Sequence, residues 1–269
     1  MNLHRKTIIG TSLLIGALVA LISLVGIYAP DFYSRETSNW QIQAAAQDII
    51  DLVMVVPALM VAALLTFSNK KAASALWSGV LLYLVYTLAI YCFDVHFNSL
   101  FPVYCLLFGI VGYAFLYSLL GIIQESIEPT GLVFKIIGLY FIVVSVLFYL
   151  LWLSEIIPAA WMNTVPQSLV EVGLPTNPVH VLDLAFVLPG IFVVGLLILK
   201  KRPIGITLAP VVLTFFILMD ITIAAIMVMM VRNGFEGSYA IAIFMALLAI
   251  LSLGLLTWYI QYTWTYESK

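Results

Sequence analysis

The sequence predicts an all-α polytopic membrane protein, with eight transmembrane helices arranged as two parallel four-helix repeats and both termini in the cytoplasm. Three observations lead to this prediction. Hydrophobic residues make up 64% of the 269 residues and charged residues only 9%, whereas soluble domains carry about 25% charged residues. Apolar stretches of membrane-spanning length recur along the chain. One acidic motif, placed near the start of such a stretch, occurs twice.

Eight apolar stretches are long enough to cross a hydrocarbon core about 30 Å thick. In chain order they are Thr7–Ala29, Ile49–Phe67, Ala73–Phe93, Leu100–Ile123, Val133–Leu153, Val179–Leu199, Ile204–Val231 and Tyr239–Tyr262. The first stretch follows a short basic segment, but it is too long for an ordinary signal peptide and lacks a small-residue cleavage site. We therefore expect a true transmembrane helix there. Long outer loops, Pro30–Asp48 and Ser154–Pro178, are expected before the second and sixth stretches.

Basic residues near the ends of the stretches set the predicted orientation, because Lys and Arg at these positions stay in the cytoplasm. With the N-terminus inside, nine of the eleven Lys and Arg residues are cytoplasmic, and only Arg35 and Arg232 lie outside. Ten of the thirteen acidic residues then lie outside or in the outer half of a stretch. Such an acidic face would attract cations, although a simple lack of Lys and Arg in outer loops is the alternative. The expected location is the plasma membrane.

The motif Asp-Leu-x-x-Val-x-Pro begins at Asp51 and again at Asp183, 132 residues later. Aligning residues 48–65 with residues 180–197 gives seven identities in eighteen positions. Leu and Val matches are common between membrane helices, but the Asp and Pro matches are not. We infer a duplication, with a first repeat at 1–124, a cytoplasmic connector at 125–135 and a second repeat at 136–269. Because each repeat has an even number of helices, the two are parallel repeats related by an axis along the membrane normal.

Asp51 and Asp183 are the first candidates for a functional site, because an ionisable group inside a membrane span is costly without a partner or a function. Each has a companion three residues earlier on the same helical face, Asp48 in the first repeat and His180 in the second. Asp220, in the seventh stretch, is expected at a similar outer depth. If the second and sixth helices flank the repeat axis, Asp51 and Asp183 converge. If these helices lie at the periphery, the two carboxylates are separated.

Pro57 and Pro189 are expected to break the helices just below these acids. A proline inside a helix frees the carbonyl four residues earlier, here that of Val53 or Ala185. Carboxylates, an imidazole and free carbonyls together indicate a cation or proton site. A divalent metal ion is one cofactor that such ligands would suit, held by Asp48, Asp51, His180 and Asp183. The alternative is that the prolines only kink the helices for packing.

Each candidate also has a structural explanation. Asp48 would complement a helix dipole if a helix began there. The pair Asn177–Pro178 predicts a helix start, as N-cap and first residue, and His180 in that first turn could simply bond to a loop. Asp94 and His96 are expected in a solvated loop, from which they could still join the site. Aromatic residues are expected in interface belts or in packing: Tyr83, Tyr86, Tyr104, Tyr113, Tyr117, Trp152, Trp258 and Trp264. Gly109, Gly112, Gly190 and Gly195 are expected at close helix contacts.

The function that we expect from the sequence is a small cation- or proton-linked transporter with an acidic site that faces outward. Its ligand would be a small cation or another small molecule, and its constant partner the lipid bilayer. Whether the protein is an enzyme stays open: a metal-dependent enzyme acting on a lipid-like substrate in the outer leaflet is the first alternative. A non-catalytic sensor or accessory subunit is the second. Motifs for nucleotide binding and zinc proteolysis are absent, and nothing indicates nucleic-acid binding.

Overall fold

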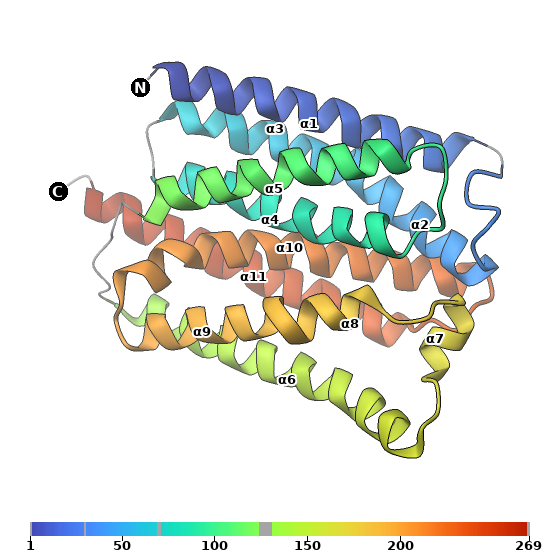
Figure 1. Ribbon diagram of the computed structural model, residues 1–269. Helices are drawn as coiled ribbons and strands as arrows, with labels where there is room; N and C mark the ends of the chain where they lie inside the picture. Colours follow the sequence, from blue (N-terminus) through green and yellow to red (C-terminus); the bar gives the residue numbers. More distant parts are fainter. Residues whose placement is uncertain (1, 30, 69–70, 124–130, 268–269) are drawn as a thin grey trace. The chain divides into compact units, whose positions relative to one another are not determined.

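Helix is the only regular structure in residues 2–29, 31–68, 71–123 and 131–267, which are the residues that the computed structural model describes (Figure 1). The chain divides into two compact units. The larger unit comprises Met1–Glu125 and Pro210–Lys269, and the smaller unit comprises Ser126–Ala209.

The larger unit is a bundle in which one long helix carries a widened turn. Its elements are α1 (Asn2–Tyr28), α2 (Ser38–Ile50), the π-helix η1 (Asp51–Val55), α3 (Val56–Leu65), the 3₁₀ turn η2 (Thr66–Ser68), α4 (Lys71–Phe93), α5 (Phe101–Ile123), most of α10 (Pro203–Arg232) and α11 (Tyr239–Glu267). Helices α2, η1 and α3 are continuous, and α1 packs along all three (Figure 1). Helix α4 packs between α3 and α5. Buried Leu59, Leu84 and Leu107 form part of this core.

The smaller unit is built around two long helical segments that pack side by side. It contains α6 (Leu132–Met162), α7 (Gln167–Val172), α8 (Pro178–Leu182), the π-helix η3 (Asp183–Val187), α9 (Leu188–Leu199) and the first residues of α10. Helix α6 packs along α9 (Figure 1). The two backbones approach closely at Gly138 and Gly195, where a Cβ on Gly195 would lie 2.8 Å from the Gly138 carbonyl oxygen. The expected close contact at Gly195 is confirmed, whereas Gly190, like Gly109 and Gly112 of α5 in the larger unit, faces open space.

The eight membrane-spanning helices predicted from the sequence are confirmed in the described residues, since eight helices there are long and apolar enough to cross a bilayer. Two boundaries were wrong. The second span begins at Ser38, eleven residues before the predicted Ile49, and α6 continues to Met162 instead of ending near Leu153. The long outer loops are therefore largely helical. Hydropathy alone missed the start of α2 because its polar side chains bond to one another within the unit, as Gln43 does with Asn39.

The predicted duplication is a property of the sequence, and the predicted orientation is a property of the chain in its membrane. A compact unit is defined by packing, whereas a repeat is defined by sequence, so the boundaries 1–124 and 136–269 stay predictions. Residues 124–130 of the predicted connector lie outside the described residues. The cytoplasmic location of the termini stays a prediction as well.

Candidate functional site

Asp48 is held by two phenols inside the larger unit. Its side chain is 0% exposed. The Tyr33 hydroxyl donates to Asp48 Oδ2 at 2.7 Å, and the Tyr91 hydroxyl donates to Oδ1 at 2.6 Å. Gly26 of α1 covers this carboxylate so closely that a Cβ at that position would overlap it. Burial, with the neighbouring carboxylate as the second cause, raises the pKa of Tyr33, so this phenol stays a donor.

The interpretation of Asp48 as a residue at a helix N-terminus is wrong. Helix α2 begins at Ser38, ten residues earlier, and Thr37 is its N-cap. The Thr37 hydroxyl accepts from the Trp40 backbone N–H at 3.3 Å. Asp48 therefore lies near the end of α2, where its carboxylate is a partner of tyrosines and does not complement a helix dipole.

Asp51 belongs to a second polar group, which joins side chains of α2, η1, α4 and α10 in the larger unit. Gln47 Nε2 donates to Asp51 Oδ1 at 2.9 Å, and the Tyr83 hydroxyl lies 3.1 Å from the same oxygen. Gln47 Nε2 also donates to the Tyr83 oxygen at 2.7 Å. On the other side, the Tyr83 hydroxyl is 2.9 Å from Thr222 Oγ1 of α10. A single phenolic proton thus has two acceptors within reach, the Asp51 carboxylate and the Thr222 hydroxyl.

Asp220 is buried in α10 but is not part of this group. Its side chain is 4% exposed, and its Oδ2 has no hydrogen-bond partner among the described residues. Residues two apart in a helix point to nearly opposite sides, so Asp220 faces away from Thr222 and Tyr83. Among the described residues, Thr222 bonds to Tyr83, and Tyr91 bonds to Asp48.

His180 and Asp183 lie together in the smaller unit, beside α6. The predicted helix start is confirmed, because Asn177 Oδ1 accepts from the Val179 N–H at 2.8 Å. Trp152 Nε1 donates to Asp183 Oδ2 at 2.8 Å, and the Trp152 ring lies 4.5 Å from the His180 ring. His180 Nε2 is buried and forms no hydrogen bond with any residue that the structure describes, and Glu155 Oε2 is 3.9 Å away.

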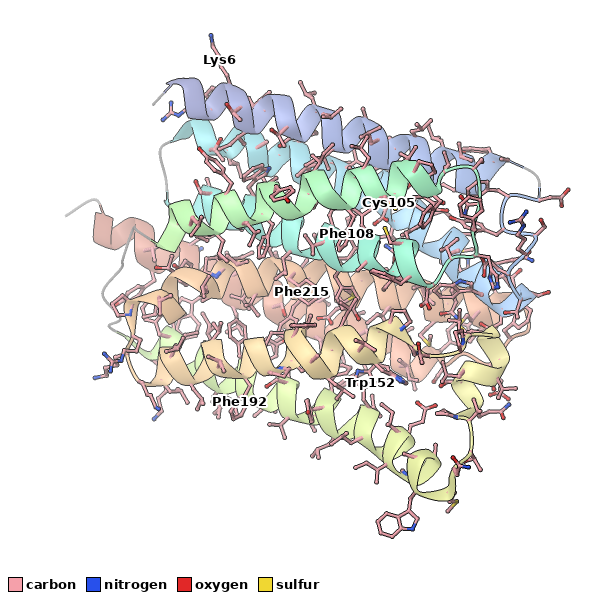
Figure 2. The ribbon with its side chains drawn as sticks, viewed as in Figure 1. Lys6, Cys105, Phe108, Trp152, Phe192 and Phe215 are labelled. Carbon is pink, nitrogen blue, oxygen red and sulfur yellow. The ribbon has the colours of Figure 1, made fainter. Side chains whose placement is uncertain are left out.

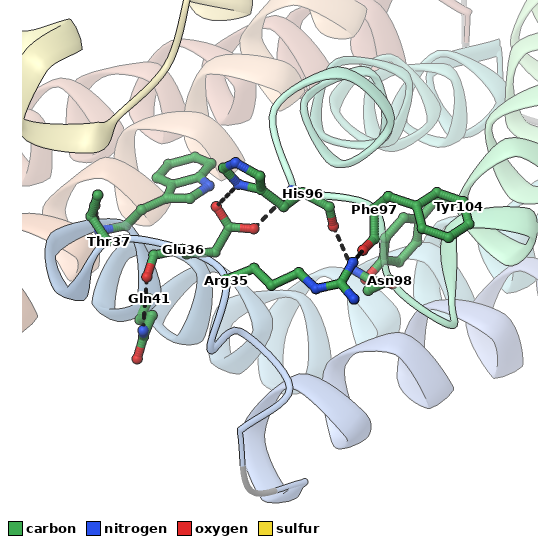
Figure 3. Close-up of polar contacts among 9 residues, drawn as sticks. Arg35, Glu36, Thr37, Gln41, His96, Phe97, Asn98 and Tyr104 are labelled. Carbon is green, nitrogen blue, oxygen red and sulfur yellow. Dashed lines mark hydrogen bonds and ion pairs between the residues drawn. The ribbon is translucent and has the colours of Figure 1, made fainter.

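Asp94 and His96, expected in a solvated loop, both lie near Glu36 in the larger unit. Figure 3 shows the contact between His96 and Glu36. Glu36 is buried and accepts from the His96 backbone N–H at 2.7 Å, with His96 Nδ1 2.8 Å from its other oxygen. Arg35 donates to the Phe97 carbonyl. His96 is about half exposed, but Asp94 is buried, and its Oδ1 has no hydrogen-bond partner in the part of the chain that the structure describes. The expectation is therefore wrong for Asp94. Burial and the nearby Glu36 raise the pKa of Asp94 to about 7.

Both copies of the repeated motif form the same local structure, a five-residue π-helix that begins at the aspartate. The residue before each proline donates its N–H to the carbonyl of that aspartate, from Val56 to Asp51 and from Leu188 to Asp183. The sequence predicted an α-helix broken at Pro57 and Pro189. In the structure, each proline instead follows a widened π-helical turn, and such turns are frequent at functional sites.

The structure thus divides the predicted site residues between the two units. Asp48 and Asp51 lie in the larger unit, and His180 and Asp183 lie in the smaller one. Each has partners within its own unit, and the convergence of Asp51 with Asp183 stays a prediction. Within either unit, the described residues place no three His, Cys, Asp or Glu side chains where they could hold a metal ion. A metal set drawn from both units also stays a prediction.

Several residues that complete these groups were missed or were assigned other roles from the sequence. Tyr33, Gln47 and Glu155 were not identified as site residues, although a Gln four residues before an intramembrane Asp was a usable signal. Tyr83 and Trp152 were expected in belts or packing, yet both bond to the predicted acids. Their partners are far away in the chain, so no short-range pattern indicates them.

The chain is a multi-pass integral membrane protein, given its eight apolar helices of membrane-spanning length. Among known proteins, no family model, no curated protein and no solved structure matches it.

Proposed function

We propose that the protein is a small proton- or cation-linked transporter of the plasma membrane. The observation that carries this proposal is the pair of buried carboxylates in the larger unit. Asp48 and Asp51 lie inside a membrane-spanning helix. Their hydrogen-bond partners in the described residues are phenols and an amide, and neither carboxylate forms an ion pair there with Lys or Arg.

A carboxylate without a counter-ion is expensive in a low-dielectric region, and the cost falls when it takes up a proton or a cation. Tyrosine hydroxyls and the Gln47 amide suit both states, because they stabilise the ionised form and tolerate the neutral one. Intramembrane acids with such neutral partners are typical of proton and ion pathways. The larger unit therefore offers a binding site whose occupancy changes its local charge.

The hydrogen-bond group around Tyr83 gives this change a mechanical consequence. Tyr83 of α4 contacts Asp51 of η1 and Thr222 of α10. A protonated Asp51 accepts a weaker hydrogen bond from the Tyr83 hydroxyl than the carboxylate does. The Tyr83 hydroxyl can then donate its proton to Thr222 Oγ1 instead. The contact between η1 and α4 then weakens where the π-helix already departs from regular α-helical geometry. Loading of the site is thereby linked to movement of the helix that carries it.

The predicted duplication and orientation complete the proposal. Two parallel repeats that rock against each other are a known way to alternate access. With cytoplasmic termini, Asp48 and Asp51 would lie in the outer half of the membrane, below a face rich in acidic residues that attracts cations.

Proton movement in proteoliposomes tests the proposal. The purified protein is reconstituted with pyranine inside, and Na⁺, K⁺, Mg²⁺ or tetraethylammonium is added outside. We expect at least one cation to drive proton movement, which Asp48→Asn and Asp51→Asn abolish. Asp31→Asn is the matched control, because Asp31 is exposed and its positive φ of 60° suits asparagine. Inactivity of the parent protein with all four cations, or full activity of Asp51→Asn, would refute transport at this site.

Metal analysis of the same preparation separates the transporter from the alternative of an intramembrane enzyme. A transporter of this kind needs no resident metal. About one equivalent of divalent metal, lost in Asp183→Ala, would favour the metal-dependent enzyme instead.

A further inference from the structure

An apolar groove lies between α6 and α9 of the smaller unit. Tyr149 and Leu150 of α6 line one side, and Pro189, Phe192 and Val193 line the other. Figure 2 shows Phe192 on α9. The cavity volume of about 360 Å³ falls within the range of about 300–1,000 Å³ that is typical of small-molecule sites. Its walls suit a hydrocarbon chain.

The groove leads toward the polar group around His180. Trp152 lies two residues beyond Leu150 on α6, and Asp183 lies six residues before Pro189. Trp152 and Asp183 are joined by a hydrogen bond. The buried His180 Nε2, which has no hydrogen-bond partner among the described residues, lies at this same end, 3.9 Å from Glu155. From Ser145 to Glu155 the groove and the polar group extend roughly 15 Å along α6.

The polar end is complementary to a cation. Residues 136–199 contain no Lys or Arg, whereas Glu155 and Asp183 both lie at this end. His180 is the one side chain in this segment that can become cationic. Two acids beside an indole ring provide both a counter-charge and a surface for cation–π contact. An anionic head group would instead be repelled.

We propose that the smaller unit binds a single-chain amphiphile with an ammonium head group. The head lies against Glu155, Asp183 and the Trp152 ring, and the chain occupies the groove past Leu150 and Pro189. A bare metal ion fits less well, because within the described residues no three His, Cys, Asp or Glu side chains are placed to hold one. This binding goes beyond the proposed transport and does not depend on it.

Native mass spectrometry from a neutral detergent tests the binding with three probes. Dodecyltrimethylammonium carries both parts of the proposed ligand. Dodecyl sulfate has the same chain with an anionic head, and tetramethylammonium has the head without the chain. We expect saturable binding of one dodecyltrimethylammonium, with affinity at least tenfold higher than that of the other two probes. Equal binding of dodecyl sulfate or of tetramethylammonium would overturn the proposal.

Variants locate the site on the protein. The double variant Glu155→Gln, Asp183→Asn should weaken binding at least tenfold, whereas Glu171→Gln, on α7 and outside the polar group, should not change it. Val193→Trp should fill the groove and block the chain, with Val143→Trp, on an exposed part of α6 outside the groove, as the control for bulk. Gel filtration and circular dichroism confirm folding of each variant. Parent-like binding by the folded double variant, or by folded Val193→Trp, would refute the site.

Discussion

Asp94 is a buried carboxylate whose ionisation should cost stability. Its pKa is raised from an ordinary 3.8 to about 7, by burial first and by Glu36 second. The folded state therefore binds the Asp94 proton more tightly than the unfolded state does. The contribution of Asp94 to the free energy of unfolding is fully present below about pH 4. It decreases as the pH rises toward 7, and the free energy of unfolding stays lower above that pH. Glu36, which contacts His96, is the charged group that the structure places near Asp94.

We predict that Asp94→Asn removes this loss. The variant should match the parent near pH 4 and exceed it near pH 8, by on the order of 1–4 kcal/mol. Thermal unfolding in detergent between pH 4 and pH 8 measures the difference, with Asp31→Asn as the exposed control. A difference that is the same at every pH would mean that Asp94 does not titrate in this way.

The hydrogen bond between Tyr91 and Asp48 should couple the contributions of these two residues to stability. Tyr91→Phe leaves one oxygen of a buried carboxylate without its donor, which typically costs about 1–3 kcal/mol. In the Asp48→Asn background the same substitution should cost less, because the carboxylate that needs the donor is absent. Denaturant unfolding of the four proteins of this cycle gives the coupling. Equal costs in both backgrounds would show that Tyr91 and Asp48 are energetically independent.

At the scale of elements, hydropathy predicted the helices well wherever a span is apolar from end to end. Helices α4, α5 and α9 begin or end within two residues of the predicted positions. Helix α2 was missed because Asn39, Gln43 and Gln47 look like loop residues in a sequence. In the structure these side chains bond to each other or to Asp51. Hydropathy measures transfer to lipid and does not register a polar group that is satisfied inside the protein.

The two π-helices could be predicted only in part. A proline six residues after Asp51 and Asp183 indicates a break in the α-helical hydrogen bonding. Whether the chain then kinks or widens depends on the tertiary environment of the helix. Both copies widen in the same place, and this shared geometry is consistent with a common origin of the two segments.

The close approach of α6 and α9 gives a prediction with an internal control. Gly195→Ala places a Cβ 2.8 Å from the Gly138 carbonyl oxygen, a backbone atom that cannot move without separating the helices. We expect a loss of about 1–3 kcal/mol, as is typical of overpacking. Gly190→Ala, in the same helix and facing open space, should be neutral or slightly stabilising, because alanine favours helix. Thermal unfolding should therefore rank Gly195→Ala below Gly190→Ala, and the reverse order would contradict this packing.

On the scale of the whole molecule, the acids of the candidate site could be found from the sequence, but most of their partners could not. Asp48 and Asp51 are conspicuous because charge is rare in membrane spans. Tyr33, Tyr83 and Thr222 resemble ordinary interface or packing residues, and they lie 15, 32 and 139 residues from the positions that they contact. Only folding brings such distant residues together, so one sequence without its structure contains no signal for these pairings.

The predicted duplication leads to a distance that can be measured. If the second and sixth spans flank the axis of two parallel repeats, the segments after Asp51 and Asp183 lie on packed neighbouring helices, about 8–10 Å apart between axes. Val53 and Ala185 are exposed positions two residues beyond each acid. Nitroxide labels there, with Cys92 and Cys105 replaced by Ser, should give an electron–electron distance of roughly 25 Å or less once label length is added. A distribution centred well beyond that range would place the two spans at the periphery, and Asp51 and Asp183 would then act at separate sites.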